Sequence, residues 1–240
     1  MIFQLLRSGL SGPEIVMHII MMFIAITLTF SFHEFMHAAT AVWLGDDTPK
    51  RMGRYTMNPL VHSDPMGTIL ILLIGFGWGR PVVYNPAALR KYKNIRLMNI
   101  LVAFAGPFGN FLMALAGTVI GTVIECVCDI DSNSIVFVIY GIMSYLVTFS
   151  LGLMAFNLLP INPLDGFKIL DELIPLKFKY NSEGYKKFVA LGPQILLILI
   201  IIGRLGGMDI LGTIMGIISF PASFLLGVIK LLIYMAFGVL

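Results

Sequence analysis

Charged residues are scarce in this chain of 240 amino acids. Asp, Glu, Lys and Arg together make up 12% of it, whereas 58% is hydrophobic. Soluble domains are close to half apolar and about a quarter charged, so this composition excludes an ordinary water-soluble domain and predicts a protein embedded in a bilayer. The basic residues are scattered between apolar segments, which excludes a nucleic-acid partner because no polar basic face can form.

Cysteine is also scarce, and a cleavable leader is not expected. The two cysteines, Cys126 and Cys128, are separated by a single residue. A disulfide at that spacing would be strained, and two cysteines cannot build a disulfide framework, so they report no redox compartment. No small-residue cleavage site precedes the first long apolar stretch, and residues 1–13 are therefore expected to form a short interfacial segment rather than a cleaved signal peptide.

Long apolar segments, in contrast, are abundant. A helix that crosses a bilayer needs about 20 mostly apolar residues. The sequence predicts an all-α polytopic membrane protein with about five to six transmembrane helices, forming one integral-membrane domain over residues 1–240. The predicted spans are 14–44, 97–125, 135–159, 188–202 and 210–239.

A sixth apolar segment, Met66–Trp78, is too short to be a span, because a helix rises only about 1.5 Å per residue and the hydrocarbon core is about 30 Å thick. It is expected to be re-entrant or interfacial. Just before it, the alternation in Arg54-Tyr55-Thr56-Met57 indicates a short strand. A re-entrant or short β element is therefore expected after the first span.

The basic residues are divided unevenly between the two sides of these spans. If the segment 66–78 returns to the side from which it starts, thirteen basic residues share one side, and Arg7 and Arg204 lie on the other. By the positive-inside rule the N-terminus is external and the C-terminus cytoplasmic. The thirteen are Lys50, Arg51, Arg54, Arg80, Arg90, Lys91, Lys93, Arg96, Lys168, Lys177, Lys179, Lys186 and Lys187.

One motif in the first span carries chemistry. Residues 33–37 read His-Glu-Phe-Met-His. On a helix His33 and His37 lie about 40° apart on one face, with Glu34 beside it. Two imidazoles can bind zinc, and the carboxylate can act as a general base on water. Ionisable residues inside a bilayer are costly, which favours a metal site in the cytoplasmic half of this helix over a chance match.

A catalytic zinc ion usually has three protein ligands, so one more is needed. The best candidate is Asp165, which follows Pro160 and Pro163 at the predicted cytoplasmic end of the third span. The prolines unwind the helix, and non-helical backbone at membrane depth is viable where it lines a water-filled cavity. Hydrolysis requires such a cavity.

Taken together, these motifs resemble the site-2 protease family of intramembrane zinc metalloproteases. The likeness rests on His-Glu-x-x-His in an early span and, at 157–166, Asn-Leu-Leu-Pro-Ile-Asn-Pro-Leu-Asp-Gly. Residues 62–67 and 105–110 also resemble the pattern of that family, so the likeness covers roughly 32–166. Asn162 stands where relatives commonly carry proline. The chain leaves no room for a PDZ or CBS domain, which implies a compact core enzyme.

The resemblance implies one zinc ion per chain, held by His33, His37 and Asp165. Glu34 would take a proton from the attacking water and return it to the leaving amine. The implied activity is that of a zinc endopeptidase that cuts a transmembrane or juxtamembrane helix of a membrane-protein substrate, as in regulated intramembrane proteolysis. The segment 50–78 is a candidate for unwinding that helix by pairing with it as a strand.

Four further polar residues allow two interpretations each. Asn157 matches the motif asparagine of the family and could donate a hydrogen bond to the substrate or oxyanion, or simply bond between helices. Asn110 could do the same, or serve packing. His18 is too far along the helix to be a ligand, which favours interfacial packing. His62 could line an entrance or bond a loop carbonyl.

A function from another class uses the same ligands: a non-catalytic membrane metal-binding or transport protein. A transport path would need further acidic residues inside the spans, and few are found beyond Glu34. An inactive relative would also have lost Glu34 or a ligand. The sequence therefore favours the enzyme, with a membrane-protein substrate and the lipid bilayer as partners, and leaves the oligomeric state open.

Overall fold

A computed structural model describes residues 5, 7, 9–74, 77–130, 133–205 and 209–239, except for the side chains of 72, 74, 204 and 205. Residues 1–4, 6 and 8 of the expected interfacial segment 1–13 lie outside these residues, as do 75–76 of the expected re-entrant segment. The described part is mostly helical. Its helices are α2 (Gly12–Trp43), α3 (Thr48–Arg51), α4 (Pro59–His62), α5 (Pro65–Ile74), the 3-10 helix η1 (Pro86–Ala88), α6 (Ile95–Val127), α7 (Ser134–Asn157), α8 (Asp165–Leu173), α9 (Leu176–Asn181), α10 (Glu183–Leu205) and α11 (Ile210–Ala236).

Five helices of the described part are long and apolar enough to cross a membrane, namely α2, α6, α7, α10 and α11. They confirm the five predicted spans. Their starts follow the local sequence. Ser11 and Glu14 form a capping box at the start of α2, and the side chains of Asn94 and Asn133 accept backbone N–H groups at the starts of α6 and α7.

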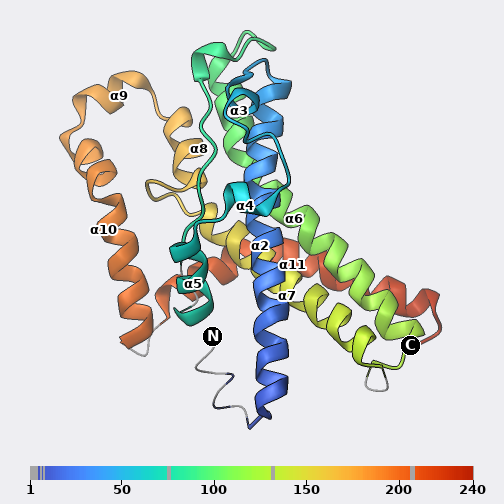
Figure 1. Ribbon diagram of the computed structural model, residues 1–240. Helices are drawn as coiled ribbons and strands as arrows, with labels where there is room; N and C mark the ends of the chain where they lie inside the picture. The colour runs from blue at the N-terminus through green and yellow to red at the C-terminus, as the bar shows by residue number, and fades with distance from the viewer. Residues whose placement is uncertain are drawn as a thin grey trace.

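The helices form a tightly packed group and a more open side (Figure 1). Helices α2, α6 and α7 pack on one another, α8 packs on α6, and α11 packs on α6 and α7. Helix α10, at the left of Figure 1, packs mainly on α9 and α11. Asn99 of α6 donates a hydrogen bond of 2.7 Å to Glu172 of α8, which fixes α8 against the packed group.

A polar cluster joins the far ends of three of these helices. Glu125, near the end of α6, forms an ion pair of 2.9 Å with Lys230 of α11. The hydroxyl groups of Tyr140 on α7 and Tyr234 on α11 also donate to Glu125. Tyr140 belongs to α7, whereas Lys230 and Tyr234 belong to α11. The Glu125 carboxylate therefore ties α11 to α6 and α7 at the end distant from the histidines.

The strand expected at 54–57 is wrong. These residues form bends between α3 and α4, and the described residues contain no strand, only an isolated antiparallel bridge between Ser63 and Gly79. Arg54 instead donates to the carbonyl of Val61, so its side chain closes the loop and opposes the extended pairing. Between the two bridge residues lies α5, whose ten residues rise only about 15 Å. The chain therefore returns to the point from which it left.

A largely non-helical segment, residues 79–91, which includes the short 3-10 helix η1, follows α5 and runs along the end of α2; we name it the strap. The strap is pinned at several points. The backbone N–H of Asn85 donates to the buried carboxylate of Asp46 at 2.6 Å, and that of Arg90 donates to the Leu44 carbonyl at 2.9 Å. The strap is therefore ordered by its backbone contacts with the turn after α2.

The interruption predicted at Pro160 and Pro163 is confirmed. Helix α7 ends at Asn157, the following residues form turns and bends, and α8 begins with Asp165 as its first residue. Gly166 is required here, because a Cβ at this position would lie 2.6 Å from the carbonyl oxygen of Leu159. The tight turn directs Asp165 back toward α2.

Candidate metal site

Two histidines of α2 form the first part of the site. His33 and His37 are 4% and 8% exposed, and their Nε2 atoms lie 3.1 Å apart. One helical turn separates them, so the same stretch of backbone sets the position of both rings. The local periodicity that predicted the pair is thus sufficient to place it.

Asp165 completes a triangle of ligand atoms. Its Oδ2 lies 3.1 Å from His37 Nε2 and 3.2 Å from His33 Nε2, and the carboxylate is 3% exposed. In tetrahedral zinc coordination, with ligand distances of 2.0–2.1 Å, neighbouring ligand atoms lie about 3.3 Å apart. The three atoms therefore need to separate only slightly to hold a metal ion, as this buried group could.

The other ring nitrogens are occupied by α6. His37 Nδ1 lies 2.7 Å from the carbonyl oxygen of Val102, and because a carbonyl can only accept, Nδ1 carries the proton. In the neutral ring, the form that binds metal, His37 Nε2 then presents a lone pair. His33 Nδ1 lies 3.0 Å from the amide of Asn110. Buried partners of this kind orient the ligands of metal sites.

A glycine of α6 makes room for both rings. A Cβ built on Gly106 would lie 2.6 Å from Cε1 of His33 and 2.6 Å from Cε1 of His37. Any other residue at this position would push the imidazoles away from their present places. The backbone of α6 thus forms the wall against which the two histidines rest.

The second oxygen of Asp165 has its own partner. Lys168, one turn further along α8, donates to Oδ1 at 2.8 Å, so Oδ2 alone faces the imidazoles. Burial on its own would raise the pKa of Asp165, but the nearby rings of His37 and His33 outweigh it and lower that pKa. Asp165 is therefore a carboxylate, the form that binds metal.

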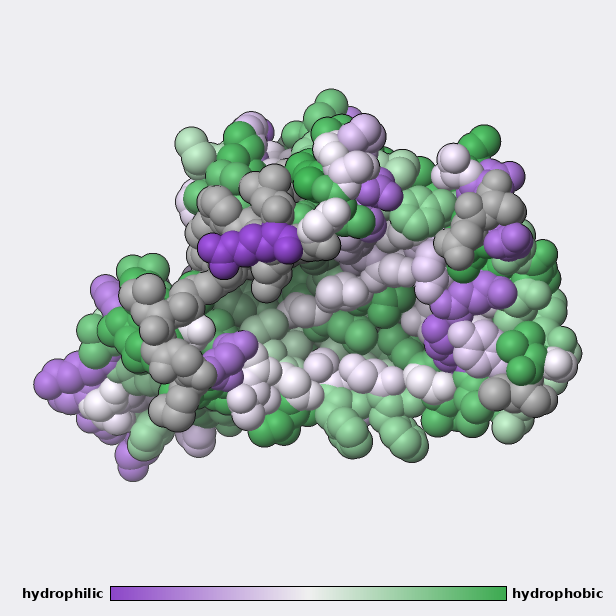
Figure 2. Space-filling model, turned by 90° about the horizontal axis from the view of Figure 1, so that it is seen from below, coloured by the Kyte–Doolittle hydropathy of each residue, from purple (hydrophilic) through white to green (hydrophobic). Residues whose placement is uncertain are grey.

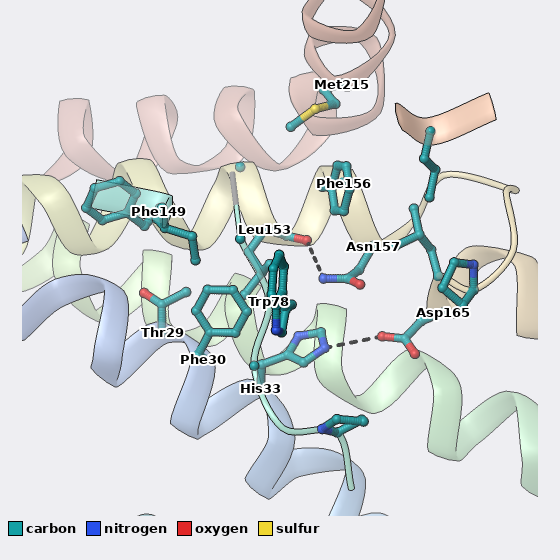
Figure 3. A pocket seen from close by; sticks show the side chains of 18 of the residues that line it. Thr29, Phe30, His33, Trp78, Phe149, Leu153, Phe156, Asn157, Asp165 and Met215 are labelled. Carbon is teal, nitrogen blue, oxygen red and sulfur yellow. Dashed lines mark hydrogen bonds and ion pairs between the residues drawn. The ribbon is translucent and has the colours of Figure 1, made fainter. Parts of the chain in front are cut away.

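The group lies at the side of a cavity of about 1080 Å³. Figure 2 shows this face of the molecule hollowed, with mostly apolar side chains around the hollow. In the close-up of Figure 3, Phe30, Phe149 and Phe156 surround the space beside His33 and Asp165. The cavity is therefore an apolar chamber with one strongly polar corner.

Helices of the packed group and the more loosely packed helix α10 both line this chamber. Residues of α2, α7 and α8 share it with the strap and with the inner faces of α10 and α11. Tyr84 of the strap is among its polar groups. Burial, with the carboxylates of Glu172 and Asp165 nearby, raises the pKa of Tyr84 to about 12, so it stays a neutral hydroxyl.

Glu34 also lines the cavity. Its carboxylate is 9% exposed, and its Oε2 accepts a hydrogen bond of 2.7 Å from the backbone N–H of Val82 in the strap. Glu34 and His33 line the same cavity, although neighbouring residues of a helix point about 100° apart. The sequence-predicted acid thus lies at the polar corner.

The two asparagines differ in position. Asn157 lines the cavity, and its Nδ2 donates a hydrogen bond of 3.1 Å to the Leu153 carbonyl of its own helix. The interhelical bond that was one of its two interpretations is not found among the described residues. In Figure 3 it points from α7 into the chamber. Asn110 is fully buried against His33 and is not among the lining residues, which favours packing over substrate contact.

The remaining two histidines have structural partners. His18 Nδ1 lies 2.9 Å from the hydroxyl of Tyr145, which confirms interfacial packing between α2 and α7. His62 is completely buried, and its Nε2 donates to the Thr56 carbonyl at 2.8 Å. Of the two roles considered for His62, the loop contact is the one the structure contains.

Sequence reasoning missed several contributors to the site. Lys168 stands three residues after Asp165, a spacing at which helical side chains meet, so this contact could have been found. The Val102 carbonyl and the Val82 N–H are backbone groups and leave no trace in side-chain identity. Gly106 was noticed within a motif, but its contact with the imidazoles depends on how α6 packs on α2.

A buried two-histidine, one-carboxylate group inside a bundle of membrane-length helices defines a class of membrane metalloprotein. Comparison with known proteins identifies the family within this class. "Putative zinc metalloprotease YwhC" of Bacillus subtilis is 40% identical over 172 residues, covering 65% of this chain and 71% of YwhC. No family model matches the chain, and no solved structure matches it significantly.

More distant relatives carry a similar name. "Putative zinc metalloprotease Rip2" of Mycolicibacterium smegmatis is 28% identical over 149 residues, covering 60% of this chain and 53% of Rip2. Rip2 of Mycobacterium tuberculosis H37Rv is 28% identical over 144 residues, covering 58% and 51%. The match thus spans about half the length of the Rip2 proteins.

The chain belongs to the zinc metalloprotease family that includes YwhC. Its cofactor is zinc, as the names of these relatives and the buried ligand group both indicate. Five membrane-length helices make it a multi-pass membrane protein.

Proposed function

We propose that this protein is an intramembrane zinc endopeptidase of the site-2 protease type. His33, His37 and Asp165 would hold the zinc ion, and Glu34 would be the general base. The observation that carries the proposal is the triangle of ligand atoms with sides of 3.1–3.2 Å, buried at the corner of an apolar cavity. A carboxylate beside it supplies the group that hydrolysis needs.

In this proposal Glu34 takes a proton from the attacking water and delivers it to the leaving amine. When bound, zinc supplies a Lewis acid that polarises the peptide carbonyl and lowers the pKa of water. Asn157 can donate to the substrate only after its Nδ2 leaves the Leu153 carbonyl. Its role would therefore begin when a peptide enters the cavity.

The tautomer of His33 follows from the same assignment. If Nε2 binds the metal, the proton is on Nδ1 and needs an acceptor. Asn110 can offer its Oδ1, which is buried without a partner in the orientation in which Nδ2 faces the ring. Turning the amide pairs Oδ1 with this proton and moves Nδ2 to the position at which Oδ1 has no partner; the two ends of an asparagine amide are assigned from their neighbours. Asn110 is thus a positioning residue for His33.

The substrate we propose is a transmembrane or juxtamembrane segment of another membrane protein. An apolar cavity lined by Phe30, Phe149 and Phe156 suits apolar side chains, and the breadth of the chamber suits a peptide rather than a small polar metabolite. The distribution of basic residues supports an external N-terminus and a site near the cytoplasmic side. The short helix α5 would then be a re-entrant element from that side.

The test is cleavage in a defined bilayer. Purified protein would be reconstituted into liposomes with labelled single-span peptides whose apolar helix contains glycine or proline near one end, and products located by mass spectrometry. We expect a cut inside or next to the apolar segment, abolished by Glu34→Gln and by a zinc chelator. Cleavage that survives Glu34→Gln would contradict the proposed base. Bound zinc without cleavage of any peptide would favour the non-catalytic metal-binding alternative.

A further inference from the structure

The strap holds the carboxylate of Glu34 through a backbone group. Val82 N–H donates to Glu34 Oε2 at 2.7 Å. Among the residues that the structure describes, no other group donates a hydrogen bond to this carboxylate or forms an ion pair with it. A carboxylate that is only 9% exposed is costly to leave without a donor, and a bond to an ionised acceptor is stronger than a neutral one.

The position of Val82 is fixed from both sides. Before it, Arg80 N–H donates 2.7 Å to the carbonyl of His62, next to the bridge that closes the α5 excursion. After it, Asn85 N–H donates to Asp46 at the end of α2. Both anchors are buried, at 0% exposure. The N–H between them is therefore presented to Glu34 by a braced segment.

We propose that the backbone N–H of Val82 is the positioning group of the catalytic base. It engages Oε2 alone, so Oε1 is left for the attacking water. This inference rests on the proposed function, because it gives Glu34 the role of base. The strap thereby connects the base of the α5 segment and the turn after α2 to Glu34, the proposed general base.

If the Val82–Glu34 hydrogen bond were only structural, Glu34 would anchor the strap and loss of the bond would not affect turnover. The two roles are separated by asking first whether the bond exists and then whether removing the donor, with the metal site intact, slows the chemical step.

The first measurement is amide hydrogen exchange of the detergent-purified protein, resolved to single residues by fragmentation. In Glu34→Ala the Val82 amide should exchange roughly 10- to 100-fold faster than in wild type, the range expected for losing a bond to a charged acceptor. The Arg80 amide is the internal control. In Glu34→Gln, whose side-chain oxygen still accepts, Val82 should stay closer to wild type. Unchanged exchange in Glu34→Ala would overturn the proposal.

The second measurement removes the donor. Val82→Pro deletes the N–H, and Val83→Pro is the matched control, because Val83 N–H makes no bond within the described part of the chain and Val83 does not line the cavity. With bound zinc equal, we expect kcat of Val82→Pro to fall roughly 10- to 100-fold with little change in KM. Equal kcat for both variants would overturn the positioning role.

The exchange experiment also separates this proposal from the proposed function. It needs neither a substrate nor turnover. If Val82→Pro fails to fold or to retain zinc, the exchange rates in the Glu34 variants still decide whether the bond exists. If wild type cuts no peptide, the assignment of the base fails, even where the Val82 amide is protected.

Discussion

The metal-bearing group of helices and helix α10 are held in very different ways. Half of the most apolar window of α6 and 33% of that of α2 are buried inside the protein, against 11% of that of α10, a fraction that α7 shares. Helices α2, α6 and α7 all contact one another and α8 packs on α6, whereas α10 packs mainly on α9 and α11. Both nevertheless line the same cavity.

This difference in packing matches two requirements of the proposed enzyme, which are to hold the metal ligands rigidly and to admit a substrate helix. Ligand atoms have to be held within a fraction of an ångström, which requires a packed and hydrogen-bonded surrounding. A helix that a substrate passes on its way into the cavity has to move aside. Segments with few buried contacts can do so at a low cost in free energy. We infer that the chemistry is built on the packed group and that access depends on α10.

The largest effect is expected for the residues at the metal itself. His33→Ala and Asp165→Ala should lose bound zinc, because each removes one of three ligands. Glu34→Gln should retain about one zinc ion per chain but lose cleavage by roughly 1,000-fold, within the range for a general base. Metal content of detergent-purified protein, measured without chelator, checks all three. Zinc retained in Asp165→Ala would mean that α8 supplies no ligand.

A glycine that has no side chain to take part in the chemistry should be nearly as sensitive. Gly106→Ala places a methyl group 2.6 Å from Cε1 of both His33 and His37, so the rings have to move. We expect zinc affinity to fall roughly 100-fold, at the upper end for changes beside ligands. The matched control is Gly121→Ala on the same helix, where the added Cβ would be 3.5 Å from Met143, an ordinary contact. Competition titration with a chromophoric chelator measures both.

A smaller effect is expected where only the orientation of a ligand changes. Asn110→Ala removes the partner of His33 Nδ1 and should weaken zinc binding roughly 10-fold. Asn110→Asp keeps an acceptor for the Nδ1 proton and should bind more tightly than Asn110→Ala. If Asn110→Asp were as weak as the alanine variant, Asn110 would not accept from His33, and the turned amide would be wrong.

Much of the fold could be predicted because it depends on segment length. The five spans follow from apolar runs and the ends from caps such as Ser11 and Asn133. The expected strand at 54–57 failed since alternation over four residues is a weak signal, and the Arg54 side chain found a local carbonyl instead. The orientation in the membrane remains a prediction.

The candidate metal site also has a part that the sequence could predict and a part that it could not. His33, Glu34 and His37 are neighbours on one helix, so their meeting is a local property that periodicity reveals. Asp165 required a further clue, the proline-broken end of a span. Neither route could find the Val82 N–H or the Val102 carbonyl, because backbone groups are the same in every sequence and only the packing of distant segments selects them.

The smallest effect on the metal, but an informative one, is expected on α10. Leu197 lines the cavity and is 56% exposed, whereas its neighbour Ile198 is 54% exposed and does not line it. Leu197→Trp fills part of the chamber and should raise KM for a helical peptide several-fold while zinc content stays at the wild-type level. Ile198→Trp is the matched control and should leave both unchanged.

Two outcomes at α10 would contradict the separation of tasks. Loss of zinc in Leu197→Trp would show that α10 supports the ligands despite its few contacts. Equal KM for the two tryptophan variants would show that substrate does not pass this wall, and entry would then have to occur on the side of α5 and the strap, where Trp78 lines the cavity. A higher KM with intact zinc would instead mean that α10 controls access without contributing to the metal site.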